Sequence, residues 1–133
     1  MALGPRLLLA PLLLAVLAFA GCDDGPVRLE VTVQDWNGWT EEQPEPVVTS
    51  YELAAGESFT VEVVGTEELV VTVVQVDGGE VALETSAPMA GEGDGGGTDI
   101  RHPRTEFSLD RAGAVSFTTP TLDGGTTVTV AER

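Results

Sequence analysis

The feature that most constrains this sequence is a repeated alternation of apolar and polar residues with a period of two. From Val27 to Gln34, valine or leucine occupies every second position, and Ser58 to Val64 repeats the pattern. A period of two places alternate side chains on opposite faces of a β-strand, so each segment predicts a half-buried strand. No segment after residue 22 has the 3.6-residue period of a helix. The sequence therefore predicts an all-β fold.

Further strands are expected wherever short apolar runs lie between turn residues. Leu69 to Val76 is apolar at nearly every position, which predicts a central strand covered on both faces. Asp77-Gly78-Gly79 predicts the hairpin turn that follows it. The remaining expected strands are Val47–Leu53, Val81–Thr85, Glu106–Leu109, a segment with Val115 and Phe117 inward, and Thr126–Ala131.

Turn signals recur about every 8 to 12 residues, a spacing typical of small all-β domains. We therefore expect residues 27–133 to form one immunoglobulin-like antiparallel β-sandwich of about seven to eight strands. The Cys-Trp-Cys core of antibody domains is absent, because the chain has one cysteine. A small barrel is the alternative architecture.

Two tryptophans flank the strongest turn signal in the chain. Asn37-Gly38 predicts a tight type I′ hairpin, since both residue types accept positive φ. Trp36 and Trp39 would then be cross-strand neighbours, on the polar face if the period holds. An exposed aromatic pair is a candidate binding surface for sugar rings, lipid or a protein partner. Packing of the pair within the domain is the alternative.

The alternation breaks down between Ser86 and Arg104. Ala90 to Gly97 is rich in glycine and has little to bury, so we expect a flexible loop. Glu92, Asp94 and Asp99 lie in or beside this loop, and their carboxylate oxygens suit Ca²⁺. Their spacing matches neither the EF-hand loop nor a repeated glycine-aspartate nonapeptide, and a solvated loop without metal is the alternative.

The first residues have the pattern of an export signal. Arg6 supplies an early positive charge, and Leu7 to Ala20 is apolar apart from Pro11. This run is shorter than the ~20 apolar residues that a membrane-spanning helix needs. We therefore expect residues 1–21 to be a cleaved signal peptide.

The end of this segment, Phe19-Ala20-Gly21-Cys22, resembles the lipobox of bacterial lipoproteins. The resemblance implies that Cys22 carries acyl chains and holds the protein in the cell membrane or outer membrane, facing the periplasm or the cell exterior. Residues 22–26 would then be a short tether. Ala18-Phe19-Ala20 also fits the general signal peptidase, so secretion of a soluble protein is the alternative.

After Cys22 the chain has five arginines, no lysine and 22 carboxylates, which gives a side-chain charge of −17. This charge repels the phosphates of nucleic acid, so we expect no nucleic-acid partner. It suits a cationic partner, and solubility or adaptation to salt is the alternative explanation.

One positive cluster, Arg101, His102 and Arg104, lies beside the glycine-rich segment. It would dock an acidic partner or lipid phosphates, or it neutralises nearby carboxylates of the same chain. His102 is the only histidine, and nucleophilic triads and metal sites need further groups that the domain lacks. We expect no enzyme, metal or cofactor, but a binding or structural module with a protein or glycan partner. A Ca²⁺-binding or enzyme-accessory domain is the alternative.

Two segments resemble known sandwich families. Phe107 to Phe117, with the Thr-Val-Thr-Val strand after it, resembles the closing hairpin of cupredoxins; blue copper needs a thiolate and two imidazoles, so this implies the fold alone. Gly93–Gly97 ahead of Phe107, and the segment Gly56–Phe59, resemble chagasin-type inhibitors of papain-like cysteine proteases, which implies an inhibitor. Thr119-Pro120-Thr121 stands where that family has Arg-Pro-Trp.

Overall fold

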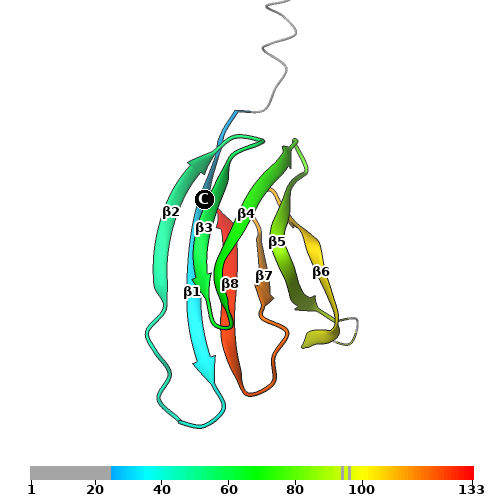
Figure 1. Cartoon of the computed structure of the whole chain (residues 1–133). Helices are drawn as coiled ribbons and strands as arrows, with labels where there is room; N and C mark the ends of the chain where they lie inside the picture. Colours follow the sequence, from blue (N-terminus) through cyan, green and yellow to red (C-terminus); the bar gives the residue numbers. More distant parts are fainter. Residues whose placement is uncertain (1–24, 94, 96) are drawn as a thin grey trace, which may run out of the picture.

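The computed structural model describes residues 25–93, 95 and 97–133, so the expected lipidation site Cys22 lies outside the described residues. Eight antiparallel strands form a nearly closed, barrel-like sheet (Figure 1). They are β1 (Val27–Asn37), β2 (Val47–Leu53), β3 (Ser58–Val63), β4 (Thr66–Val76), β5 (Glu80–Glu92), β6 (Thr98–Asp110), β7 (Ala114–Thr118) and β8 (Gly124–Glu132). The all-β antiparallel prediction is confirmed. Within the described residues, no helix is long and apolar enough to cross a membrane.

The strands follow one another around the sheet in the order β2-β1-β8-β7-β5-β4-β3, and β6 pairs with β5. β2, β1, β8 and β7 make one half of the structure, and β3, β4, β5 and β6 make the other. β5 joins the halves, because its last residues leave β4 and pair with β7 at Ala90 and Thr118. The sheet is therefore continuous on this side and ends at the free edges of β2 and β3 on the other.

The inward residues of all eight strands form one apolar core. On β1 the inward side chains Val27, Leu29 and Val31 are at most 2% exposed, as their alternation predicted. The rings of Phe107 and Phe117 stack across the strands with centroids 4.6 Å apart. Each large apolar side chain buried in this way contributes about 1.5 to 3 kcal/mol. The fold depends on this core, since no disulfide bond is possible in a chain with one cysteine.

The predicted β4–β5 turn is confirmed. The backbone N–H of Asp77 donates to the carbonyl oxygen of Glu80 at 3.0 Å. The Asp77 carboxylate accepts hydrogen bonds from the N–H groups of Glu80 and Gly79, each at 2.8 Å. These two backbone donors lower the pKa of Asp77 below its ordinary value.

The expectation of a tight hairpin at Asn37-Gly38 is wrong. β1 continues its pairing with β8 as far as Asn37 opposite Gly124, and β2 begins only at Val47. The side-chain oxygen of Asn37 accepts hydrogen bonds from the backbone N–H groups of Trp39 and Thr40, each at 3.1 Å. Asn37 therefore starts a longer loop through an Asx turn instead of filling a two-residue turn.

The expectation of a flexible loop from Ala90 to Gly97 is also wrong for much of this segment. β5 extends to Glu92, β6 starts at Thr98, and the two strands pair at Gly91 and Asp99. Met89, Ala90 and Gly91 are buried. Backbone hydrogen bonds form a ladder whatever the side chains are, so a glycine-rich segment can be a strand without showing the alternation.

The expectation that β4 is covered on both faces is wrong as well. Leu69, Val71 and Val73 are fully buried, but Val70 is 37% and Val74 is 49% exposed. The outward valines lie on a face that no second layer covers among the described residues. Apolar residues on both faces of a strand therefore do not identify a central, doubly covered strand in this protein.

An ion pair between Arg111 and Glu132 connects the β6–β7 turn to the end of β8, and Arg111 also bonds to the β4–β5 turn. Arg111 donates from Nε and Nη2 to the carboxylate of Glu132 at 2.9 Å each, and from Nη1 to the carbonyl oxygen of Asp77 at 2.7 Å. The backbone N–H of Ala112 adds a bond of 2.7 Å to Glu132. Arg111 and then Ala112 hold the pKa of Glu132 below its usual 4.5.

We expect Glu132→Gln to lower the free energy of unfolding at pH 7 by about 1 to 2 kcal/mol, since it removes a charge-assisted, bidentate contact. The folded-state pKa is depressed, so this contribution is complete above the unfolded pKa near 4.5 and is lost as pH falls through the folded value. Urea titrations of both proteins from pH 7 to pH 3 measure the difference. Glu30→Gln, at the more exposed pair with Arg133, is the control and should cost less. A difference that stays constant with pH would contradict the assignment.

Candidate functional site

Three adjoining hollows form an open groove that runs from β4 and β5, between β6 and β7, to β1. We call it the β6–β7 groove. The volumes of the three hollows are about 380, 560 and 410 Å³. The first and second share Arg104, Ser108 and Val115. The second and third share Thr98, Thr118 and Thr127. The shared walls make the three hollows one continuous surface feature.

The groove exists because β6 and β7 are neighbours that do not pair. β7 pairs with β8 along its whole length, but it meets β5 at the single pair Ala90–Thr118. β6 pairs with β5 alone among the described strands. The edge of β7 from Ala114 to Phe117 therefore has no ladder partner in the described part of the chain, and its residues line the second hollow.

Trp36 forms one wall of the third hollow. Its side chain is half-buried, and its indole Nε1–H donates to the hydroxyl oxygen of Thr118 at 3.2 Å. A Cβ atom at Gly125, the residue opposite Trp36 on β8, would lie 3.2 Å from the indole ring and 1.9 Å from the Thr119 hydroxyl. The glycine is therefore needed mainly for the close approach of the Thr119 hydroxyl, and the indole lies against the same bare backbone. Ile100, near the start of β6, lines the same hollow.

A cluster of threonine hydroxyls lies behind the indole, and no sequence motif predicted it. Thr118 donates to the carbonyl oxygen of Thr126 at 2.9 Å and accepts from the Thr127 hydroxyl at 3.1 Å. The fully buried Thr126 donates to the Asp35 carboxylate at 2.8 Å and accepts from the backbone N–H of Val64 at 2.9 Å. Threonines on strands are usually surface residues, so only their recurrence on both β7 and β8 could have pointed to this cluster.

Arg104 lies where the first and second hollows meet. Its guanidinium carbon is 4.8 Å from the centroid of the Phe107 ring, and its Nε donates to the carbonyl oxygen of Glu106 at 3.2 Å. A Cβ atom at Gly91 would lie 2.6 Å from its Nη2, so the guanidinium fits against bare backbone. None of the described carboxylates forms an ion pair with Arg104. Its remaining N–H groups are available to a ligand.

Arg101 and His102 lie outside the groove. Both are exposed on β6, which begins at Thr98 and not at Glu106 as expected. His102 Nδ1 lies 3.1 Å from a carboxylate oxygen of Asp99. The predicted positive cluster is therefore divided, because only Arg104 of its three members reaches the groove.

Trp39 lies apart from Trp36, at the end of the molecule formed by the β1–β2 and β7–β8 loops. Its side chain is 76% exposed, and Leu122 in the neighbouring loop is 77% exposed. The two loops are joined by a hydrogen bond of 2.9 Å from Gly38 N to the carbonyl oxygen of Asp123. The structure does not bring the two tryptophans together, so they belong to two separate surfaces.

The described residues contain no group of three or more His, Cys, Asp or Glu side chains able to hold a metal ion. Of the three carboxylates considered for Ca²⁺, Asp94 lies outside the described residues and Asp99 contacts His102. The calcium site stays a prediction.

In comparisons with known proteins, the chain matches no protein-family model, no curated protein and no solved structure. The features available for recognition are the β6–β7 groove and the loop end that carries Trp39.

The different exposure of the two tryptophans predicts different fluorescence. In Trp36→Phe the remaining Trp39 should emit at long wavelength and be quenched strongly by acrylamide. In Trp39→Phe the remaining Trp36 should emit further to the blue and be quenched severalfold less, since it is half-buried and hydrogen-bonded to Thr118. Circular dichroism of both variants controls for folding. Equal quenching of the two folded variants would contradict this assignment.

Proposed function

We propose that this chain is a lipid-anchored envelope protein whose barrel-like domain is a non-catalytic module that binds a glycan segment in the β6–β7 groove. One observation carries the proposal. In the third hollow the Trp36 indole has no charged neighbour in the lining, whose other members are Ile100 and five neutral polar residues: Gln34, Thr98, Thr118, Thr121 and Thr127.

Neutral polar groups around an indole suit a sugar. The apolar faces of sugar rings stack on aromatic side chains, and their hydroxyls exchange hydrogen bonds with hydroxyl and amide groups. The strong negative charge of the domain does not repel a neutral ligand. Arg104, further along the groove, would pair with a carboxylate on an acidic sugar, and this contact would be charge-assisted.

The position of the groove suits a ligand that lies away from the membrane. Arg104 on β6 pairs with Met89 on β5, and the next residue, Ala90, pairs with Thr118 on β7. Thr118 pairs with Thr127 on β8, which pairs with Gln34 on β1, so Arg104 and Gln34 lie at about the same level of the sheet. Gln34 is roughly 23 Å along β1 from Val27 at about 3.3 Å per residue. With an anchor at Cys22, the groove would face the envelope space, so we do not favour docking of Arg101 and Arg104 onto lipid phosphates.

We also infer that the fold is a variant of the immunoglobulin-like sandwich. Its support is the division into two four-stranded halves with one core between them. The crossing of β5 from one half to the other would be the main departure from a simple sandwich.

An alternative function is inhibition of a cysteine protease. Its support is that Thr98, directly after the glycine-rich segment, lines the same hollow as Thr121, which lies where chagasin-type inhibitors have Arg-Pro-Trp. Titration of papain with the domain separates the two functions, since an inhibitor would abolish papain activity and a glycan-binding module would not.

Glycan binding is tested by titrating ¹⁵N-labelled domain with chitohexaose, cellohexaose and maltohexaose at millimolar concentration. At least one should shift the indole N–H signal of Trp36. Trp36→Ala should weaken that binding by at least tenfold, which corresponds to about 1.4 kcal/mol. The matched control, Trp39→Ala, should bind like the unmodified domain. If no oligosaccharide shifts Trp36, or if Trp39→Ala is the variant that loses binding, this proposal is wrong.

The anchor is tested by the mass of the protein extracted from membranes of the cells that make it. We expect a chain that begins at Cys22 and carries the added mass of two or three acyl chains, since two chains give stable attachment where one is marginal. Cys22→Ser should release the protein from the membrane fraction. A mature chain that begins at unmodified Cys22 or Gly21 would support the secreted alternative.

A further inference from the structure

The strand β2 has a free edge with unusual properties. Its seven residues pair with β1 on one side. No described strand pairs with its other side, because β2 is the first strand in the order of the sheet. Figure 1 shows β2 at the outer limit of the structure. This edge is a place where a further strand can be added.

The register identifies which backbone groups face outward. Arg133 N donates to the carbonyl oxygen of Arg28, so the even-numbered residues of β1 bond to β8 and the odd-numbered ones bond to β2. Val47, Thr49, Tyr51 and Leu53 are opposite the odd-numbered residues of β1. The N–H and C=O groups that point to the free edge are therefore those of Val48, Ser50 and Glu52.

This edge lacks the features that usually prevent strand addition. Val47 to Tyr51 contains no charge and no proline, and its pairing with β1 has no bulge. Val47 and Val48 are 62% and 56% exposed. By contrast, β3 has a register shift next to Val63.

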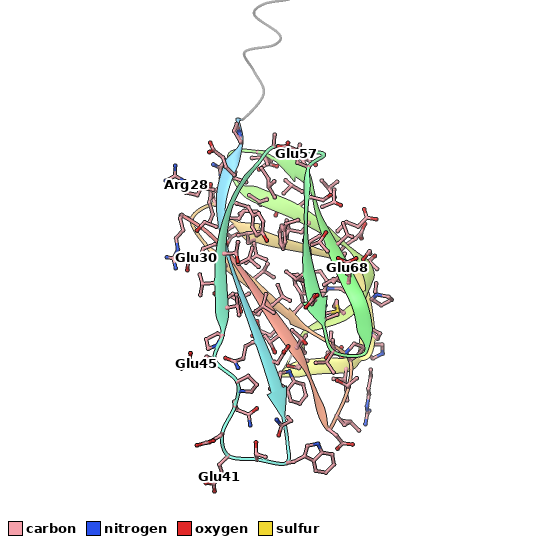
Figure 2. The ribbon with its side chains drawn as sticks, turned by 60° about the vertical axis from the view of Figure 1, so that its left-hand side comes forward. Arg28, Glu30, Glu41, Glu45, Glu57 and Glu68 are labelled. Atoms are coloured by element: carbon pink, nitrogen blue, oxygen red, sulfur yellow. The ribbon has the colours of Figure 1, made fainter. Side chains whose placement is uncertain are left out.

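Carboxylates flank the uncharged part of β2 at both ends. Glu41 and Glu45 lie in the loop before the strand, and Glu57 lies in the turn after it (Figure 2). Glu52 is on the strand itself, opposite Arg28 on β1. A segment that lies along β2 therefore meets an uncharged middle and negative charge at each end.

We propose that the free edge of β2 binds an extended segment of a basic partner protein as a ninth strand. Three backbone pairs at Val48, Ser50 and Glu52 would hold the middle of the segment, which is uncharged and rich in β-branched residues. Lysine or arginine at its two ends would pair with the flanking carboxylates. A second copy of this chain is disfavoured, because the residues after Cys22 carry a side-chain charge of −17 in each copy. The proposal is independent of the glycan groove.

The test uses the amidated peptide Lys-Lys-Val-Thr-Val-Thr-Val-Lys-Lys and amide hydrogen exchange of the ¹⁵N-labelled domain. The peptide should slow exchange of the Val48, Ser50 and Glu52 amides by at least tenfold. The Thr49 and Tyr51 amides already bond to β1, so they should change less and serve as internal controls. Trp36→Ala should leave this effect intact, which separates it from failure of glycan binding.

Two matched peptides and one variant make the result decisive. The same peptide with alternate amides N-methylated on its pairing edge should give no protection, and the peptide with glutamate in place of lysine should bind at least tenfold more weakly. Val48→Pro removes an N–H that has no partner on β1, so the domain should fold and lose the effect. Absence of protection at Val48, Ser50 and Glu52 would overturn the proposal. Protection that rises with protein concentration alone would assign the edge to a second copy and also overturn it.

Discussion

The buried hydroxyl of Thr85 lies where β5 leaves one half of the sheet and turns toward the other. It donates to the carbonyl oxygen of Ala87 at 2.8 Å, and the pairing of β5 with β6 shifts register between Glu84 and Met89. This local bond satisfies a backbone group that the interrupted ladder leaves without a strand partner. Because of this change of direction, Ala90 pairs with Thr118 on β7. Ala90 and the residues after it also line the second hollow of the β6–β7 groove.

Near the start of β8, hydroxyl groups replace apolar packing. The buried Thr126 links three parts of the structure, through Asp35 on β1, Val64 after β3 and Thr119 after β7. A buried polar group is tolerated when its hydrogen bonds are made, and none of the described buried side-chain polar atoms lacks a partner. The same threonine cluster positions Trp36, so the candidate site is a continuation of the hydrogen bonds that close the barrel.

The sequence predicted those parts of the fold in which burial alternates. Phe59, Val61 and Val63 mark β3, because the side chains of a half-buried strand follow its period of two. The limits of β2 are also as expected, although its burial does not alternate. The second half of β5 shows no such alternation, since Met89, Ala90 and Gly91 are all buried. Its glycines owe their strand conformation to partners distant in the chain, such as Asp99 opposite Gly91.

The candidate site was partly accessible from sequence. Trp36 and Arg104 were identified by residue type, but their separation from Trp39 and Arg101 depends on tertiary structure. Trp36 occupies a position on the polar face of β1, and its half-buried state results from Thr118 and from the approach of Ile100. Neither neighbour can be inferred from a local pattern, because both lie far along the chain.

The position of β1 has a mechanical consequence for a tethered protein. The chain enters the domain at β1, which is hydrogen-bonded along its length between β2 and β8, and the loop end lies at the far end of the same strand (Figure 1). Tension between an anchor at residue 22 and a load held at that far end would act parallel to β1. Its two ladders would be sheared, with many hydrogen bonds resisting together, instead of being peeled apart one bond at a time. The rate of forced unfolding depends on the barrier to unfolding and not on the equilibrium stability of the domain. Loading in shear would raise that barrier and so slow forced unfolding.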